Sequence, residues 1–355
     1  MKHSHRGFTL VELMVATAVF AIFMVGMLNL LDTSTKVSQV ESSLADTQEN
    51  VRFAAYHVMR TARMMGGGGM PMAAQTVNGN NWVSGELATN QQGLVSIPGF
   101  DNVSVKQGTD VFTVRGFFEI APFFTEPGDY QGGVVNVREQ NKDDQLINNF
   151  GNFSLDSLEG RGIVFMGRGQ YCVGEIGAGN VFTGDEPDRV LVLQHGDGGD
   201  GSLFESLNEV TNTYPPSFPI SRVGVLDSYT FFVDPQNRLM RARVSGAVPR
   251  AEPVAVNIGG LQIALGLDTS DPLDGQVDVW KSAPTVGEVM ADQVAGMRLT
   301  VLGRSPVMVP DWAEPDSTFE IEDGTAQNIQ PGYKWRRIEV ATALRNFRYP
   351  KPEDQ

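Results

Sequence analysis

Cysteine is almost absent from this chain of 355 residues, because Cys172 is the only one. A single cysteine cannot form an intrachain disulfide, which excludes the small secreted proteins whose folds depend on a disulfide framework. A chain of this length can bury enough apolar surface to fold without such bonds. We expect Cys172 itself to be a small, buried hydrophobic residue.

Histidine is also scarce, with four in the chain. His3 and His5 lie near the N-terminus, His57 lies in an expected helix, and only His195 lies in the rest of the chain. A Ser-His-Asp or Cys-His arrangement would depend on this one side chain, and the spacings GxSxG, HExxH and the P-loop are missing. The sequence therefore predicts that the protein is no enzyme and that His195 is a structural or loop residue.

Positively charged residues are fewer than negatively charged ones. The chain has 27 Lys and Arg and 42 Asp and Glu, which gives a net charge of −15 and a pI near 4.7. Most of such a surface repels a polyanion, so we expect no nucleic acid as the main partner. The acidic balance is typical of an exported head that must stay soluble.

One long apolar run is present near the N-terminus. From Phe8 to Leu31 the only charged residue is Glu12, in a segment of 24 residues. As a helix it would be about 36 Å long, enough to cross a bilayer core of about 30 Å. Lys2 and Arg6 precede the run, which predicts a cytoplasmic N-terminus and an exported C-terminal part.

The order of parts near Gly7 differs from that of a secretory signal, whose apolar stretch comes before its cleavage site. A cut between Gly7 and Phe8 would leave the helix on the mature protein and create an amine about one helical turn before Glu12. An amine of this subunit or a neighbour could neutralise the Glu12 carboxylate in a low dielectric. Such an acid predicts a functional site; the alternative is that Glu12 lies among the lipid headgroups.

Residues 7–13, GFTLVEL, resemble the processing and methylation signature of type IV pilins and pseudopilins. The resemblance implies that a prepilin peptidase cuts after Gly7 and methylates the amine of Phe8. It also implies that Glu12 guides the subunit into a helical filament. Because the component thought to cap the filament tip lacks this glutamate, the resemblance implies that this subunit can sit on top of another.

The helix is expected to continue beyond the membrane, since apolar residues recur at steps of three and four. The pattern is interrupted once, by the polar residue Gln48. This stripe consists of Leu44, Val51, Ala55, Val58, Ala62 and Met65. The opposite face carries Glu41, Asp46, Glu49, Asn50, Arg52 and Arg60. Four glycines at residues 66–69 end the helix. The stripe is predicted to pack on a globular head.

That head is predicted to be β-rich, which makes the fold class α+β: a long N-terminal helix packed on antiparallel sheets. Strands are expected at residues 110–117, 189–194, 228–233, 239–244, 297–301 and 337–345, with a hairpin turn at residues 234–237. We expect a leader at 1–7, a transmembrane helix at 8–31, its amphipathic extension at 32–66, a loop-rich β region at 67–225 and a C-terminal sheet region at 226–355.

The C-terminal third resembles PilW-type minor pilins in the segments SYTFFV (228–233), LMRA (239–242), VAGMRLTVLGRS (294–305) and RRIEVATALRN (336–346). The chain is also longer than a major pilin and lacks the C-terminal cysteine pair of that class. Both features favour a minor subunit.

The sequence predicts no cofactor. The one candidate is calcium, because carboxylates in flexible loops can supply some of its oxygen ligands. One cluster consists of Asp268, Asp271, Asp274 and Asp278; another runs from Asp197 to Glu205. Neither has EF-hand spacing, and Asp-Gly loops are common turns. A basic tail is either a contact for an acidic partner subunit or a charged, solvated strand edge: Lys334, Arg336, Arg337, Arg345, Arg348 and Lys351.

The resulting expectation is a single-pass minor pilin of the inner membrane, with its head in the periplasm, that helps to prime type IV pili and lies near the filament tip. Its expected partners are prepilin peptidase, other minor pilins and the major pilin. The alternatives are a pseudopilin of a type II secretion system and a pilus-tip adhesin.

Overall fold

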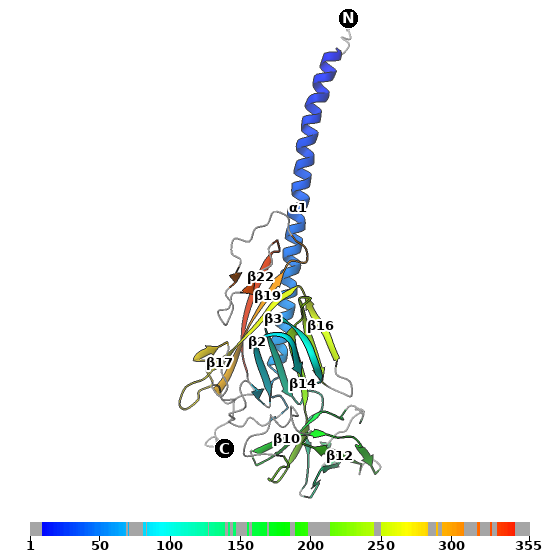
Figure 1. Ribbon diagram of the computed structural model, residues 1–355, viewed down its shortest axis with the longest axis vertical. Helices are drawn as coiled ribbons and strands as arrows, with labels where there is room; N and C mark the ends of the chain where they lie inside the picture. The colour runs from blue at the N-terminus through cyan, green and yellow to red at the C-terminus, as the bar shows by residue number, and fades with distance from the viewer. Residues whose placement is uncertain are drawn as a thin grey trace.

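Helix α1 (Leu10–Ala62) projects far beyond a β-rich head, which packs against its C-terminal half in the computed structural model (Figure 1). The structure describes residues 9–68, 70, 81–82, 84–126, 128–138, 141–142, 145–146, 155, 158–168, 170–184, 189–197, 214–244, 250–282, 289, 293–308, 318–319, 327–328 and 332–344. The predicted fold class, a long helix on an antiparallel β-rich head, is confirmed.

The helix ends slightly before the predicted position. Its last residue is Ala62, Arg63 forms the C-cap, and residues 63–68 form turns. Gly66 and Gly68 have positive φ angles of 68° and 81°, a backbone conformation that glycine adopts without steric cost. The predicted end of the helix at residue 66 is therefore too late: the helix stops at Ala62, and the glycines lie in the turn that follows it.

A six-stranded antiparallel sheet covers one side of α1. In sheet order its strands are β1 (Asn81–Trp82), β2 (Gly85–Ile97), β3 (Phe100–Gly116), β14 (Asp227–Val233), β15 (Arg238–Val244) and β16 (Arg250–Val256). The predicted hairpin is present as β14 and β15, joined by the turn at residues 234–237, where Asn237 has a positive φ of 61°.

A four-stranded antiparallel sheet covers another side of the helix. Its order is β18 (Val279–Lys281), β17 (Ile258–Leu267), β19 (Val294–Arg304) and β22 (Trp335–Ala343), so β22 lies at the edge. The predicted strands at 297–301 and 337–345 correspond to β19 and β22.

An eight-stranded sheet forms the end of the head farthest from the N-terminus of α1 (Figure 1). Its strands are, in order, β4 (Phe123–Phe124), β13 (Arg222–Val225), β9 (Gly162–Gly167), β10 (Gln170–Ile176), β12 (Val190–Gly196), β6 (Val134–Arg138) and β5 (Tyr130–Gln131), with β11 (Val181–Thr183) beside β12. Two short pairs are β7 (Asn141–Lys142) with β8 (Gln145–Leu146), and β20 (Thr318–Phe319) with β21 (Gln327–Asn328).

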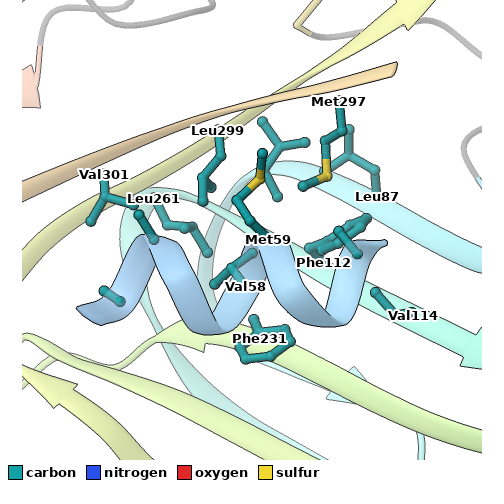
Figure 2. Close-up of a cluster of buried hydrophobic side chains, with 14 of the residues drawn as sticks. Val58, Met59, Leu87, Phe112, Val114, Phe231, Leu261, Met297, Leu299 and Val301 are labelled. Carbon is teal, nitrogen blue, oxygen red and sulfur yellow. The ribbon is translucent and has the colours of Figure 1, made fainter. Parts of the chain in front are cut away.

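The main core lies between α1 and the two sheets that flank it. Val58 and Met59 of the helix belong to one buried cluster with residues of both sheets (Figure 2). The labelled sheet residues of this cluster are Leu87, Phe112, Val114, Phe231, Leu261, Met297, Leu299 and Val301. Each buried aliphatic or aromatic side chain contributes about 1.5–3 kcal/mol, so this cluster attaches the helix firmly to the head.

The buried stripe of α1 differs from the predicted one at its N-terminal end. Val51, Ala55, Val58, Ala62 and Met65 are buried as expected, and Ala54 and Met59 widen the stripe. Farther from the head centre, Ser43 and Thr47 are buried, whereas Leu44 is half-buried. The Thr47 hydroxyl donates to the Ser43 carbonyl at 2.7 Å, which satisfies it inside the contact.

The predicted division of the head at residues 225 and 226 does not separate two sheets. Strand β3 pairs with β14 over five residue pairs, from Asp227 with Gly116 to Phe231 with Phe112. Residues 81–116 thus belong to the same sheet as residues 227–256, and the segment between them forms the eight-stranded sheet. This pairing joins segments more than a hundred residues apart, and no local sequence signal specifies it.

Candidate functional site

The N-terminal half of α1 presents apolar side chains on all sides and contacts no described part of the head. Every residue from 10 to 38 is exposed, including Phe20 at 63% and Phe23 at 74%. Its mean hydropathy reaches 2.3 over 18 residues, and none of that window is buried. Among the described residues this is the one helix long and apolar enough to cross a membrane.

Thr9 and Glu12 form a reciprocal cap at the start of this helix. The Glu12 amide donates to the Thr9 hydroxyl oxygen at 3.3 Å, and the Thr9 amide donates to Glu12 Oε2 at 3.0 Å. The Thr9 hydroxyl also donates to Glu12 Oε2 at 3.0 Å. This arrangement satisfies backbone donors that the first helical turn otherwise leaves unpaired. It also fixes the Glu12 carboxylate at the very beginning of the apolar helix.

Polar groups inside the apolar half are satisfied by the helix itself. The Thr17 hydroxyl donates to the Met14 carbonyl at 3.0 Å, and the Thr33 hydroxyl donates to the Asn29 carbonyl at 2.8 Å. Such internal bonds suit a helix surrounded by hydrocarbon, where no water replaces them. Asp32 and Lys36, on either side of Thr33, form an exposed ion pair of 2.8 Å where the sequence becomes polar.

The structure describes only one of the three predicted site residues near the N-terminus. Glu12 has the geometry given above, whereas Gly7 and Phe8 lie outside the described residues. Thr9 was not singled out by the sequence analysis. The capping-box spacing Thr-x-x-Glu at residues 9–12 is the signal that identifies it.

His195 and Cys172 are buried in the eight-stranded sheet. His195 stacks on Tyr130 with ring centres 5.3 Å apart, and its Nδ1 lies 2.8 Å from the Tyr214 hydroxyl. Burial lowers the pKa of His195 to about 4, so the ring is neutral at pH 7. Burial likewise raises the pKa of the Cys172 thiol to about 12, which leaves it protonated. The predicted burial of Cys172 is confirmed, and the structural role of His195 stays a prediction.

The aspartates of the second calcium candidate mostly bind their own loop. Asp268 accepts from the amides of Ser270 and Gly275, and Asp278 accepts from the amide of Thr269 at 2.8 Å. Asp274 accepts from the amide of Gln276. No group of three or more His, Cys, Asp or Glu that could hold a metal ion occurs in the described part of the chain. Calcium binding by this loop stays a prediction; most of the first candidate cluster lies outside the described residues.

The basic tail is only partly described. Lys334, which directly precedes β22, is buried, and Arg336 and Arg337 are exposed on β22. Arg345, Arg348 and Lys351 lie outside the described residues.

Comparison with known proteins finds the prokaryotic N-terminal methylation motif at residues 2–28, which include Gly7, Phe8 and Glu12. A type IV-like pilin from Thermus thermophilus is similar to 54% of this chain and 87% of its own, with 14% identity and a TM-score of 0.25. A TM-score this low does not define a shared fold. No curated protein matches the chain. The methylation motif and the apolar half of α1 together define a membrane-anchored, type IV prepilin-like N-terminus.

Proposed function

We propose that the chain is a minor pilin that takes part in priming and assembly of type IV pili at the inner membrane. The observation that carries the proposal is the exposed apolar half of α1, which continues without a break into the helix embedded in the head. A rigid helix of this kind can leave the bilayer and pack against similar helices while the head stays outside.

Processing prepares the helix for this step. Prepilin peptidase cuts between Gly7 and Phe8 and methylates the new amine, and Glu12 then accepts a subunit amine that sets the register of the helices. An ion pair buried among apolar helices is strong only when both partners are present, so it favours one register over its neighbours. The head is exported, and the PilW-type resemblance of the C-terminal third supports a minor subunit near the tip.

Mass spectrometry of the purified chain tests the processing step. The proposal predicts a mature N-terminus at Phe8 with one added methyl group, and an intact residue 1 would contradict it. Immunoblotting of sheared surface filaments then tests the destination. Recovery with filaments supports a pilus subunit, whereas retention in the membrane together with loss of secreted enzymes in a deletion strain would indicate a type II pseudopilin.

A further inference from the structure

The outer face of α1 separates its two kinds of charge along the helix axis. Beyond the membrane-spanning half, Glu41, Asp46 and Glu49 come first, and Arg52 and Arg60 follow; all five side chains are exposed. The structure shows no ion pair for any of the five among the residues it describes. The face is therefore acidic nearer the membrane-spanning half and basic farther from it, and its charges are available to a partner.

A shallow groove follows the same face. It runs from Ala45 to Arg63, about 27 Å of helix, and Ile338 and Val340 of β22 form part of one wall. Tyr56 lines the groove along most of its length and is 59% exposed. A projecting aromatic ring near a small residue gives the face a ridge and a recess, the features by which helices pack together.

The acidic and basic residues of this face share one spacing. Glu41 and Arg52 are eleven residues apart, and so are Glu49 and Arg60. Eleven residues make three helical turns, about 16 Å, so the members of each pair lie on nearly the same side of α1. A second, parallel copy displaced by this distance toward the membrane has Arg52 level with Glu41 and Arg60 level with Glu49. Packed helices lie about 8–10 Å apart, which is within a Debye length, so these charges attract each other.

The same displacement brings Tyr56 level with Ala45, which is also eleven residues away. The ring of one copy then lies against the small side chain of the other, at the centre of the contact. Two copies at equal height would instead place Tyr56 against Tyr56 and every charge level with its own equivalent. The face thus fits a displaced copy of itself and disfavours an undisplaced one.

We propose that this face of α1 binds the same face of a second copy of the chain, with the two helices parallel and displaced by eleven residues. The second copy is the occupant that the charges favour, because its acidic segment complements the basic one at a matching spacing. A displacement of about 16 Å sets the two membrane-spanning segments at different depths, so the pair forms when one copy is raised relative to the other. The inference does not depend on the proposed role in pilus assembly.

Sedimentation equilibrium of the full chain in detergent micelles tests the pairing through its charges. The wild type should self-associate, and Arg52→Glu combined with Arg60→Glu should weaken this association at least about tenfold, because attraction becomes repulsion. Adding Glu41→Arg and Glu49→Arg to that double variant exchanges the two signs and should recover the association. Arg250→Glu, on the exposed start of β16, is a control outside the groove and should associate like the wild type.

Engineered cysteines test the displacement itself, since the native Cys172 is buried. Chains with Ala45→Cys should form a disulfide on oxidation when they are mixed with chains that carry Tyr56→Cys. Each variant should cross-link with itself far more slowly. A monomeric wild type, unchanged association of the double arginine variant, or no recovery in the sign-exchanged variant would overturn the proposal. So would cross-linking of each cysteine variant mainly with itself.

Discussion

Thr9 and Glu12 are hydrogen-bonded to each other at the start of α1: the hydroxyl and the amide of Thr9 both donate to Glu12 Oε2. The structure shows Glu12 as a helix cap, and the proposed function adds a second role for the same carboxylate, the pairing with a subunit amine. Substitutions at the two positions separate these roles, because Thr9 belongs to the cap alone.

Removal of the Glu12 charge should abolish incorporation into filaments. Glu12→Gln keeps an acceptor for the Thr9 bonds, whereas Glu12→Ala keeps neither the cap nor the charge. We expect both variants to be lost from sheared filaments, measured by immunoblot. Thr9→Ala should cost about 1 kcal/mol of helix stability and leave incorporation largely intact. Normal incorporation of Glu12→Gln would show that the charge is not needed.

Close packing between α1 and β19 should tolerate no side chain at Gly303. A Cβ atom there would overlap the Val51 side chain of the helix. Overpacking of this kind costs about 1–3 kcal/mol, so Gly303→Ala should lower the denaturation midpoint of the full chain. Gly177→Ala is the matched control, because its Cβ would come no closer than 3.9 Å to other atoms. Equal midpoints for the two variants would contradict this packing.

Acid should destabilise the eight-stranded sheet through His195. Its pKa is about 4 in the folded protein and near 6.5 when unfolded, so the unfolded state binds the proton first. Stability therefore falls as the pH falls from about 6.5 to about 4, by up to about 3 kcal/mol. Thermal unfolding between pH 7 and 4.5 should show a smaller loss for His195→Gln than for the wild type. Parallel pH profiles would contradict the neutral, buried ring.

A buried ion pair links the eight-stranded sheet to β14. Arg161 donates to Asp227, and both are almost fully buried; Asp227 also accepts from the amides of Phe118 and Glu119 at 2.8 and 2.9 Å. Asp227→Asn should destabilise the protein by about 3–5 kcal/mol at pH 7, because it leaves the Arg161 charge unpaired. Adding Arg161→Met should restore much of that loss, measured by chemical denaturation. A double variant as unstable as the single would contradict this explanation.

The sequence predicted the parts of the fold that depend on local patterns. The helix followed from its apolar run and its stripe at Val51, Ala55 and Val58, and the β14–β15 hairpin followed from its turn residues. The pairing of Phe112 with Phe231 could not be predicted, because strand neighbours distant in sequence leave no local pattern. The contact of Arg161 with Asp227 likewise joins residues that are distant in sequence, so no local pattern predicts it.

At the candidate site, sequence reasoning reached Glu12 because a lone acid in an apolar run is conspicuous. The hydrogen bonds between Thr9 and Glu12 were also predictable, because the two residues have the three-residue spacing of a capping box. The burial of Ser43 and Thr47 in place of Leu44 was not predictable from hydrophobicity, since the helix surface that meets the head is set by the sheets around it.

The most direct test of the proposed minor pilin is to delete the gene and count surface filaments by electron microscopy, in the parent strain and in a strain that cannot retract pili. The account predicts loss of filaments in the parent and partial recovery when retraction is blocked, because a priming subunit accelerates assembly without forming the filament shaft. Unchanged filament numbers in both strains would contradict it.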